Sequence, residues 1–239
     1  MNNDESKLSS IGKLSLVVLF WLFLLVECFA LFTNRLWLYG VARSAIVPLM
    51  FFRVFSERGK GEIGALFFMA LLFSIIADGL TLYGNSLFMG YVGLSMYSIS
   101  YVGLASFIMH KASILDVRYI ILVMGIIVFC GVDILWINIP RSRDTIFYVQ
   151  IGLHVAVLLF LLISTIYLFI QIKNVSYPFI FLIAIVFVIS ANSLYGISLL
   201  RYDIHNHFLN MLVGFSHGLY IYLYANGAIR TIKESDQFD

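Results

Sequence analysis

Long apolar runs separated by short polar joints are the dominant pattern of this chain. Each run approaches the roughly 20 apolar residues that a helix needs to cross a bilayer core. We expect eight spans, near residues 14–33, 35–55, 64–83, 86–109, 117–138, 146–170, 177–200 and 207–229. The predicted fold is therefore all-α, a polytopic membrane bundle of eight transmembrane helices.

The joints between the runs, such as SERGKGE, HKAS and PRSRD, are too short to hold a folded soluble domain. We therefore predict one integral membrane domain that covers residues 1–239. The first run follows Lys7 and Lys13 and is too long for the apolar core of a signal peptide, so it is expected to stay as a signal-anchor. Cys28 and Cys130 fall inside spans, where we expect them to pack rather than to form a disulfide.

Composition and charge agree with a membrane protein. Hydrophobic residues make up 62% of the 239 residues, charged residues only 12%, and the mean hydropathy is +0.98. Most of the 15 Lys and Arg residues lie on the side of the N-terminus, and the exceptions are Arg43 inside a span and Arg35, Arg141, Arg143 and Arg201. By the positive-inside rule both termini are cytoplasmic, and we expect a bacterial inner (plasma) membrane. The net charge of +2 reflects this topology, so no nucleic-acid partner is expected.

Polar and ionisable side chains inside the spans share one depth. With about 1.5 Å of rise per residue, Glu27 and Asp78 lie about 20 Å from the cytoplasmic ends of their spans. A charge near the bilayer centre costs at least about 2.5 kcal/mol, so it requires a partner or water. Arg43 is the expected counter-ion of Glu27 or of Asp78. The outer half of the spans also holds Asp133, His154, Asn192 and His217, and we expect all these groups to face one polar cavity.

Helical spacing places several polar residues on common faces. Ser74, Asp78 and Thr81 share a face of the third run. Tyr97 and Tyr101 share a face of the fourth run, as do His217, Tyr220 and Tyr224 in the eighth. The candidate substrate-binding residues are Arg43, Tyr97, Tyr101, His154, Ser190, His217, Tyr220 and Tyr224. For the Ser and Tyr residues, hydrogen bonding between helices is the favoured interpretation, whereas the carboxyl group of Asp78 favours a functional role.

An internal similarity links the third and seventh runs. The segments FSIIADGL (73–80) and FVISANSL (187–194) match at Phe, Ile, Ala and Leu, and align Asp78 with Asn192. The two runs are four spans apart and point the same way. A duplicated four-helix unit is therefore a plausible interpretation.

The order of these features resembles the lysoplasmalogenase (YhhN-like) family of integral membrane proteins, over nearly the whole chain. LLFSIIAD (71–78) resembles the LxFSxxGD motif of that family with Ala77 in place of Gly, and FVISAN resembles its FxxSD motif. The second family aspartate falls on Ala191, next to Asn192. Other family positions are also substituted, at Val47, Tyr101 and Asn226.

The resemblance implies hydrolysis of the vinyl-ether bond of an ether lysophospholipid. An acid kept protonated by an apolar setting could protonate the alkene carbon, while a second carboxylate orients water. Asp78 is the candidate acid. The second acid would have to come from Glu27 or Asp133, because Asn192 stands beside the substituted position. No cofactor is implied.

Three weaker motifs have simpler interpretations. The GxGxxG of residues 59–64 follows no strand, so we exclude a nucleotide site. Asp203, His205 and His207 have metal-ligand spacing, but a solvated loop is favoured over a zinc site. Gly214 and Gly218 form a GxxxG that predicts close helix packing, inside the bundle or against a partner or second copy.

Three functions of different classes remain open. The first is a lysoplasmalogenase-like lipid hydrolase. The second is a catalytically inactive relative that binds membrane lipids or docks a membrane-protein partner, in line with the missing second acid. The third is a small transporter or membrane sensor, which would depend on Arg43 or Asp78.

Overall fold

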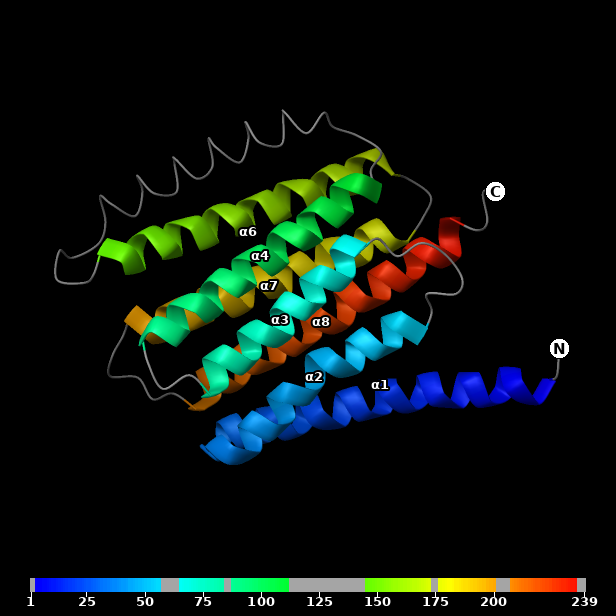
Figure 1. The fold of residues 1–239 in the computed structure, drawn as a ribbon, viewed down its shortest axis with the longest axis horizontal. Helices are drawn as coiled ribbons and strands as arrows, with labels where there is room; N and C mark the ends of the chain where they lie inside the picture. Colours follow the sequence, from blue (N-terminus) through cyan, green and yellow to red (C-terminus); the bar gives the residue numbers. More distant parts are fainter. Residues whose placement is uncertain are drawn as a thin grey trace. The chain divides into compact units, whose positions relative to one another are not determined.

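The computed structural model describes residues 3–56, 65–83, 87–111, 145–172, 176–200 and 207–235, and all regular secondary structure in this part of the chain is α-helical. The helices, labelled in Figure 1, are α1 (Asn3–Phe32), α2 (Leu36–Ser56), α3 (Ala65–Tyr83), α4 (Leu87–Lys111), α6 (Thr145–Gln171), α7 (Tyr177–Leu200) and α8 (His207–Ser235). The predicted all-α class is confirmed for these residues.

The structure supports fewer membrane-spanning helices than the sequence pattern predicts. Among the described residues, five helical stretches are long and apolar enough to cross a bilayer: Gly12–Phe32, Leu36–Ser56, Val92–Lys111, Val149–Gln171 and Tyr177–Tyr195. The apolar stretch of α3, Leu66–Leu82, is shorter. Histidine, asparagine and tyrosine side chains dilute the apolar content of α8, and the predicted span 117–138 lies outside the described residues. The expected count of eight spans is therefore not supported.

Apolar stretches of this length form helices because lipid offers no hydrogen-bond partner to the backbone, so each segment must satisfy its own N–H and C=O groups. Pro48 lies inside α2 and removes one of these donors. Membrane helices tolerate such an interruption when neighbouring groups compensate. The five apolar helices are compatible with an integral membrane protein.

The chain divides into two compact units, and each is described here by itself. Unit 1 comprises Met1–Ile63 and Phe179–Asp239, and it contains α1, α2, α8 and nearly all of α7. Unit 2 is Gly64–Pro178, with α3, α4 and α6. These units do not coincide with the two halves of the proposed sequence repeat. The repeat, and the expectation of a single integral domain, stay predictions.

In unit 1, a tight turn joins α1 and α2 into a hairpin. Asn34 adopts the left-handed conformation, with φ of 57°, which asparagine tolerates better than most residues. The N–H of Arg35 then reaches back to the carbonyl of Ala30 at 2.8 Å, the bond that closes a Schellman-type helix end. This turn brings α2 back along α1.

The glycines of α8 allow it to pack closely against α1. A Cβ atom at Gly214 would collide with the side chain of Leu31, and one at Gly218 would collide with Leu24. The antiparallel contact continues to Phe20, whose ring stacks on that of Tyr222 at 5.3 Å. The GxxxG motif thus packs inside the chain, as one of its two interpretations predicted, and an additional partner on this helix stays a prediction.

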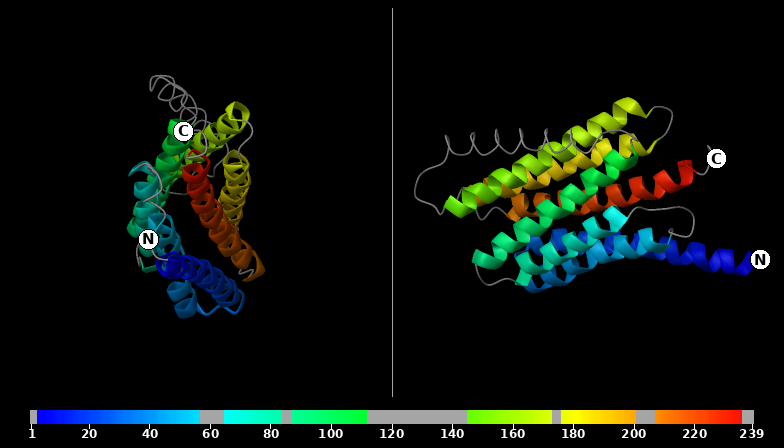
Figure 2. Two further views of the ribbon diagram at one scale, coloured as in Figure 1. Left: turned by 90° about the vertical axis from the view of Figure 1, so that its right-hand side faces the viewer. Right: turned by 45° about the horizontal axis from the view of Figure 1, so that its top comes forward.

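In unit 2, α4 lies between α3 and α6, as Figures 1 and 2 both show. Helices α3 and α4 are antiparallel and approach closely, because a Cβ atom at Gly103 would lie 3.1 Å from that of Ala70. Near this contact the rings of Phe67 and Phe107 pack at 5.1 Å. The close approach brings polar side chains of α3 within reach of α4.

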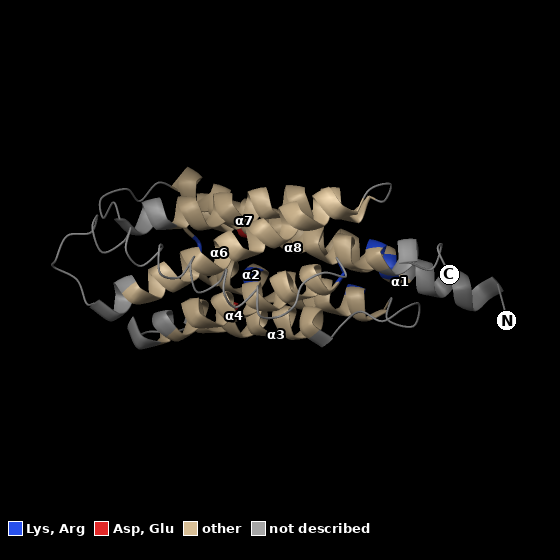
Figure 3. Ribbon diagram, turned by 90° about the horizontal axis from the view of Figure 1, so that it is seen from above, with Lys and Arg blue, Asp and Glu red and all other residues tan. Residues whose placement is uncertain are grey.

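Charge is scarce along the described helices. Figure 3 shows acidic and basic residues only at isolated positions on otherwise uncharged ribbons. Large apolar side chains are exposed instead, among them Leu25, Leu36, Trp37 and Val186. Outward apolar and inward polar groups are the arrangement that a lipid environment favours.

Candidate functional site

Asp78 on α3 is a buried acid among the described residues of unit 2. Its residue surface is only 2% exposed. The hydroxyl of Tyr97, on α4, donates a hydrogen bond to Oδ1 of this carboxyl group. Because α3 and α4 cross closely, a residue of the second helix holds the acid.

A second hydrogen bond joins α3 to α4 one turn away. Ser74 Oγ and Ser100 Oγ lie 2.8 Å apart, and both residues are buried. Two of the three members of the predicted polar face of α3 therefore form hydrogen bonds with α4. The third, Thr81, bonds back to the carbonyl of Ala77 in its own helix, at 2.9 Å.

The opposite side of α4 binds α6 through polar groups. Ser98 Oγ lies 2.9 Å from Nδ1 of His154, and the Gln150 amide donates to Ser95 Oγ at 2.6 Å. Since Tyr97 and Ser98 are consecutive, their side chains point in different directions around the helix. Helix α4 therefore contacts the acid of α3 with one residue and the imidazole of α6 with the next.

Aromatic rings connect these two polar contacts. The Tyr97 ring stacks on Tyr101 with centroids 6.4 Å apart, and Tyr101 packs on the His154 imidazole at 5.5 Å. Tyr101 and His154 are buried, whereas Tyr97 and Ser98 are only half-buried. We call the set Asp78, Tyr97, Ser98, Tyr101 and His154 the α4 seam.

Unit 1 holds its own buried acid, and this one is ion-paired. Arg43 Nη1 on α2 donates to Oε1 of Glu27 on α1 at 2.9 Å. Glu27 is fully buried, and a Cβ atom at Gly214 would lie only 3.2 Å from the same oxygen. The small residue on α8 thus makes room for the carboxylate. The sequence suggested Glu27 or Asp78 as the partner of Arg43, and the structure shows the ion pair with Glu27.

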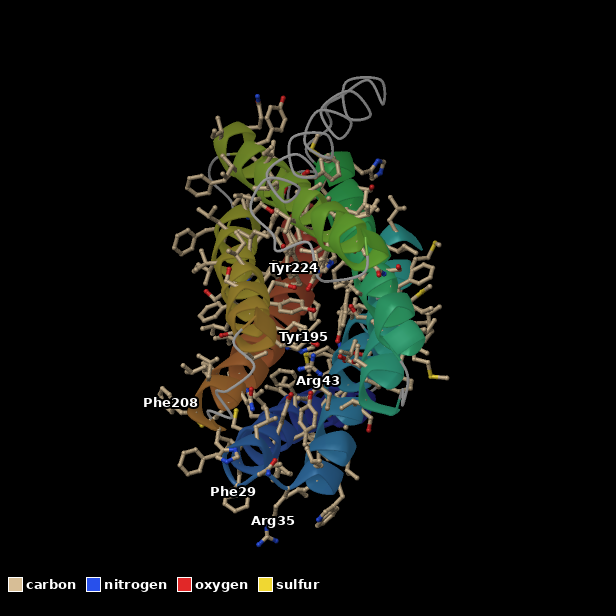
Figure 4. The ribbon with its side chains drawn as sticks, turned by 90° about the vertical axis from the view of Figure 1, so that its left-hand side faces the viewer. Phe29, Arg35, Arg43, Tyr195, Phe208 and Tyr224 are labelled. Atoms are coloured by element: carbon tan, nitrogen blue, oxygen red, sulfur yellow. The ribbon has the colours of Figure 1, made fainter. Side chains whose placement is uncertain are left out.

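Other polar groups of α7 and α8 surround this pair. The His217 imidazole and the Tyr195 hydroxyl both lie within electrostatic range of the Arg43 guanidinium. Figure 4 shows the side chains of Arg43 and Tyr195 near one another, although Tyr195 is exposed, whereas Arg35 projects outward at the end of the α1–α2 turn. His217 also packs edge-on against the Tyr220 ring at 4.8 Å. Glu27, Arg43 and His217 together are called the α1–α2–α8 cluster.

The α7 position that the resemblance assigns to a second aspartate carries no acid. Ala191 is buried on α7, and the Asn192 amide donates to the carbonyl of Val188 in the same helix at 2.8 Å. Ser190 is half-buried. This part of α7 therefore offers amide and hydroxyl groups but no carboxyl group.

The predicted site residues thus fall into two groups. Unit 1 contains Glu27, Arg43, Ser190, Asn192, His217, Tyr220 and Tyr224, and unit 2 contains Asp78, Tyr97, Tyr101 and His154. Asp133, Asp203 and His205 lie outside the described residues, and His207 is exposed at the start of α8. A single layer shared by all these residues stays a prediction.

The sequence reasoning overlooked Ser98, which connects α4 to His154. A signal for it existed. Gln150 and His154 are four residues apart on α6, and Ser95 and Ser98 are three apart on α4, so both pairs follow helical spacing. Two such pairs on neighbouring helices predict a polar contact between them.

No family model matches this chain, and no curated protein or solved structure matches it either.

Proposed function

We propose that this chain is an intramembrane hydrolase of the bacterial inner membrane, with both termini in the cytoplasm, that cleaves the vinyl-ether bond of an ether lysophospholipid. Asp78 is the acid that protonates the alkene carbon. The resemblance of LLFSIIAD to the lysoplasmalogenase motif names this reaction, and the α4 seam supplies the groups.

One observation carries the proposal: the Asp78 carboxyl group is buried and oriented by the Tyr97 hydroxyl from the neighbouring helix. A proton donor must be held in a defined geometry to act on one carbon atom. The Tyr97 hydroxyl supplies such a constraint on the Asp78 carboxyl group. Ser74, the other polar residue of the motif, also bonds to α4, so the motif as a whole builds the contact.

The test is aldehyde release by the purified full-length chain reconstituted in lipid vesicles. A 1-alkenyl lysophospholipid is the substrate, and the saturated 1-alkyl lysophospholipid, which lacks the labile bond, is the blank. Asp78→Asn should lower kcat by about 10²- to 10⁴-fold, the usual contribution of a general acid. Thr165→Ala is the matched control, because this buried hydroxyl bonds within its own helix at 2.8 Å.

Two results would overturn the proposal. One is that the wild-type chain releases no aldehyde from any alkenyl lysophospholipid. The other is that Asp78→Asn, folded to the same extent as the control, works at the wild-type rate.

A second function is favoured by α7. Since Ala191 and Asn192 stand where the family has an acid, the second candidate is a non-catalytic role in binding a lipid or a membrane-protein partner. This role predicts that lipid or a second subunit stays bound through purification in mild detergent. Mass spectrometry of the intact complex measures both, and a bare monomer that is also inactive would contradict it.

A further inference from the structure

We infer that Arg53, near the end of α2, binds the phosphate group of an anionic membrane lipid. The site belongs to unit 1, where α1, α2 and α8 contact one another in pairs. Binding at this site is independent of the hydrolysis proposed for Asp78. Three observations support it: the place of Arg53 at a helix end, the aromatic rings against which its guanidinium packs, and the lack of a described counter-ion.

Arg53 lies at the depth where lipid phosphates are expected. Helix α2 has 21 residues, and at 1.5 Å of rise per residue its length is about 30 Å, roughly the thickness of the bilayer core. Arg53 is in the last turn of this helix, at the end opposite the turn at Asn34. A basic side chain at such a helix end reaches the headgroup layer.

Aromatic rings of α8 and α1 hold the guanidinium in place. Its carbon atom Cζ lies 5.5 Å from the centroid of the Tyr222 ring, within the range of a cation–π contact. The Tyr222 ring in turn stacks on Phe20 at 5.3 Å and packs on Trp21 at 5.0 Å. Because these contacts already order the Arg53 side chain, it loses little conformational entropy when it binds a ligand.

The charge of Arg53 is not neutralised within the part of the chain that the structure describes. Its Nη1 atom is buried without a hydrogen-bond acceptor, and no described carboxylate forms an ion pair with it. The side chain as a whole is half-buried, so part of it stays accessible. A cation in this setting is costly without a partner. An anion at the accessible part of the guanidinium offsets the cost, and the planar donor fork of arginine matches the oxygens of a phosphate.

The surroundings of Arg53 favour a lipid phosphate over a soluble one. Phe52 and Phe55 flank Arg53 on α2, and both rings are exposed, at 59% and 50%, where acyl chains can cover them. Further along, Lys13 precedes Trp21 by eight residues on α1, and Arg230 follows Tyr222 by eight on α8.

These two cations lie toward the same end of unit 1, because α1 and α8 are antiparallel. Basic groups between membrane helices near the headgroup layer attract anionic lipids. Exposed rings beside a cation and further positive charge beyond it are therefore suited to a lipid with an anionic headgroup.

The test measures lipid binding to the purified full-length chain by native mass spectrometry in mild detergent. Phosphatidylglycerol is the probe, and diacylglycerol with the same acyl chains, which lacks the phosphate, is the blank. Arg53→Met should raise the Kd for phosphatidylglycerol by about 10-fold or more, because charge-assisted hydrogen bonds are lost. Arg35→Met is the matched control and should bind as the wild type. It removes the same charge from an exposed residue at the other end of α2.

A second pair of variants tests the aromatic contact. Tyr222→Leu should raise the Kd by about 2- to 5-fold, the contribution of an exposed cation–π contact. Tyr222→Phe keeps the ring and should leave the Kd unchanged. Equal Kd values for the leucine and phenylalanine variants would contradict the role of the ring in holding Arg53.

Three results would overturn the site. They are a wild-type Kd in Arg53→Met, an equal loss of binding in Arg35→Met, and equal binding of diacylglycerol and phosphatidylglycerol by the wild type. Inorganic phosphate is the third probe, and binding of this ion through Arg53 without binding of the lipid would overturn the assignment to a lipid. If Arg53→Met does not fold, judged by circular dichroism and elution as a single species, Arg53→Gln takes its place. Glutamine keeps N–H donors but lacks the charge, so a wild-type Kd in this variant would also overturn the site.

Discussion

Two buried acids in this molecule have different partners. Glu27 in unit 1 is paired with a guanidinium at 2.9 Å and enclosed by a glycine of α8. Asp78 in unit 2 accepts a hydrogen bond from a tyrosine hydroxyl. Both acids are buried to nearly the same degree, so burial by itself does not distinguish them.

The difference indicates separate roles. A carboxylate beside a guanidinium is stabilised in its charged form and serves the packing of α1 on α2, because both charges would be costly alone. A carboxyl group that accepts a hydrogen bond from a phenol hydroxyl is oriented by a residue of the neighbouring helix. The proposed chemistry is therefore assigned to Asp78, and a structural role to the Glu27–Arg43 pair.

The largest expected effect comes from breaking the ion pair. Arg43→Met leaves the Glu27 carboxylate buried without its cation, and should lower the free energy of unfolding by about 3–5 kcal/mol. Unfolding in mixed micelles with a denaturing detergent, followed by circular dichroism, measures it. The double variant Glu27→Leu with Arg43→Met should recover most of the loss, and a double variant as unstable as the single one would contradict a paired role.

A smaller effect is expected at the other acid. Tyr97→Phe removes the hydroxyl that donates to Asp78 and should lower the free energy of unfolding by about 1–3 kcal/mol, the cost of losing one partner of a buried polar group. The same unfolding measurement applies. Tyr167→Phe on α6 is the matched control, because its hydroxyl lies in an exposed contact with Gln171. Equal stability of the two variants would show that the Tyr97 hydroxyl does not stabilise the buried Asp78, and would contradict this prediction.

The smallest effect is expected at the hydroxyl pair of unit 2. Ser74→Ala breaks the 2.8 Å contact with Ser100, and such bonds between membrane helices contribute about 0.6 kcal/mol on average. A double-mutant cycle with Ser100→Ala isolates this contact. A coupling energy between Ser74 and Ser100 near the roughly 3–5 kcal/mol of a buried ion pair would contradict this ranking. The hydroxyl contact of unit 2 would then be as strong as the ion pair of unit 1.

Much of the local organisation could be predicted from the order of residues. Apolar runs predicted helices for the described residues, because a segment in lipid must satisfy its own backbone. Helical spacing predicted that Ser74 and Asp78 share a face, and both bond to α4. The glycine pair of α8 predicted close packing. The expected count of eight spans is not supported by the described residues, because polar side chains dilute α8 and the apolar stretch of α3 is short.

Partners across helices could not be predicted in this way. Spacing defines a face of a helix but not the helix that it meets, so Arg43 had two candidate acids until the α1–α2 hairpin brought it to Glu27. Ser98 was overlooked because its importance depends on α6 lying beside α4. Asp78 similarly required the antiparallel crossing of α3 and α4 to gain Tyr97.

The order of residues by itself determined that the chain forms apolar helices with a few polar side chains among them, because hydrophobic length and backbone hydrogen bonding are local properties. Only the tertiary structure decided which acid meets a cation and which meets a hydroxyl. Those pairings join residues 16 and 19 positions apart in the two units, and they depend on how neighbouring helices cross.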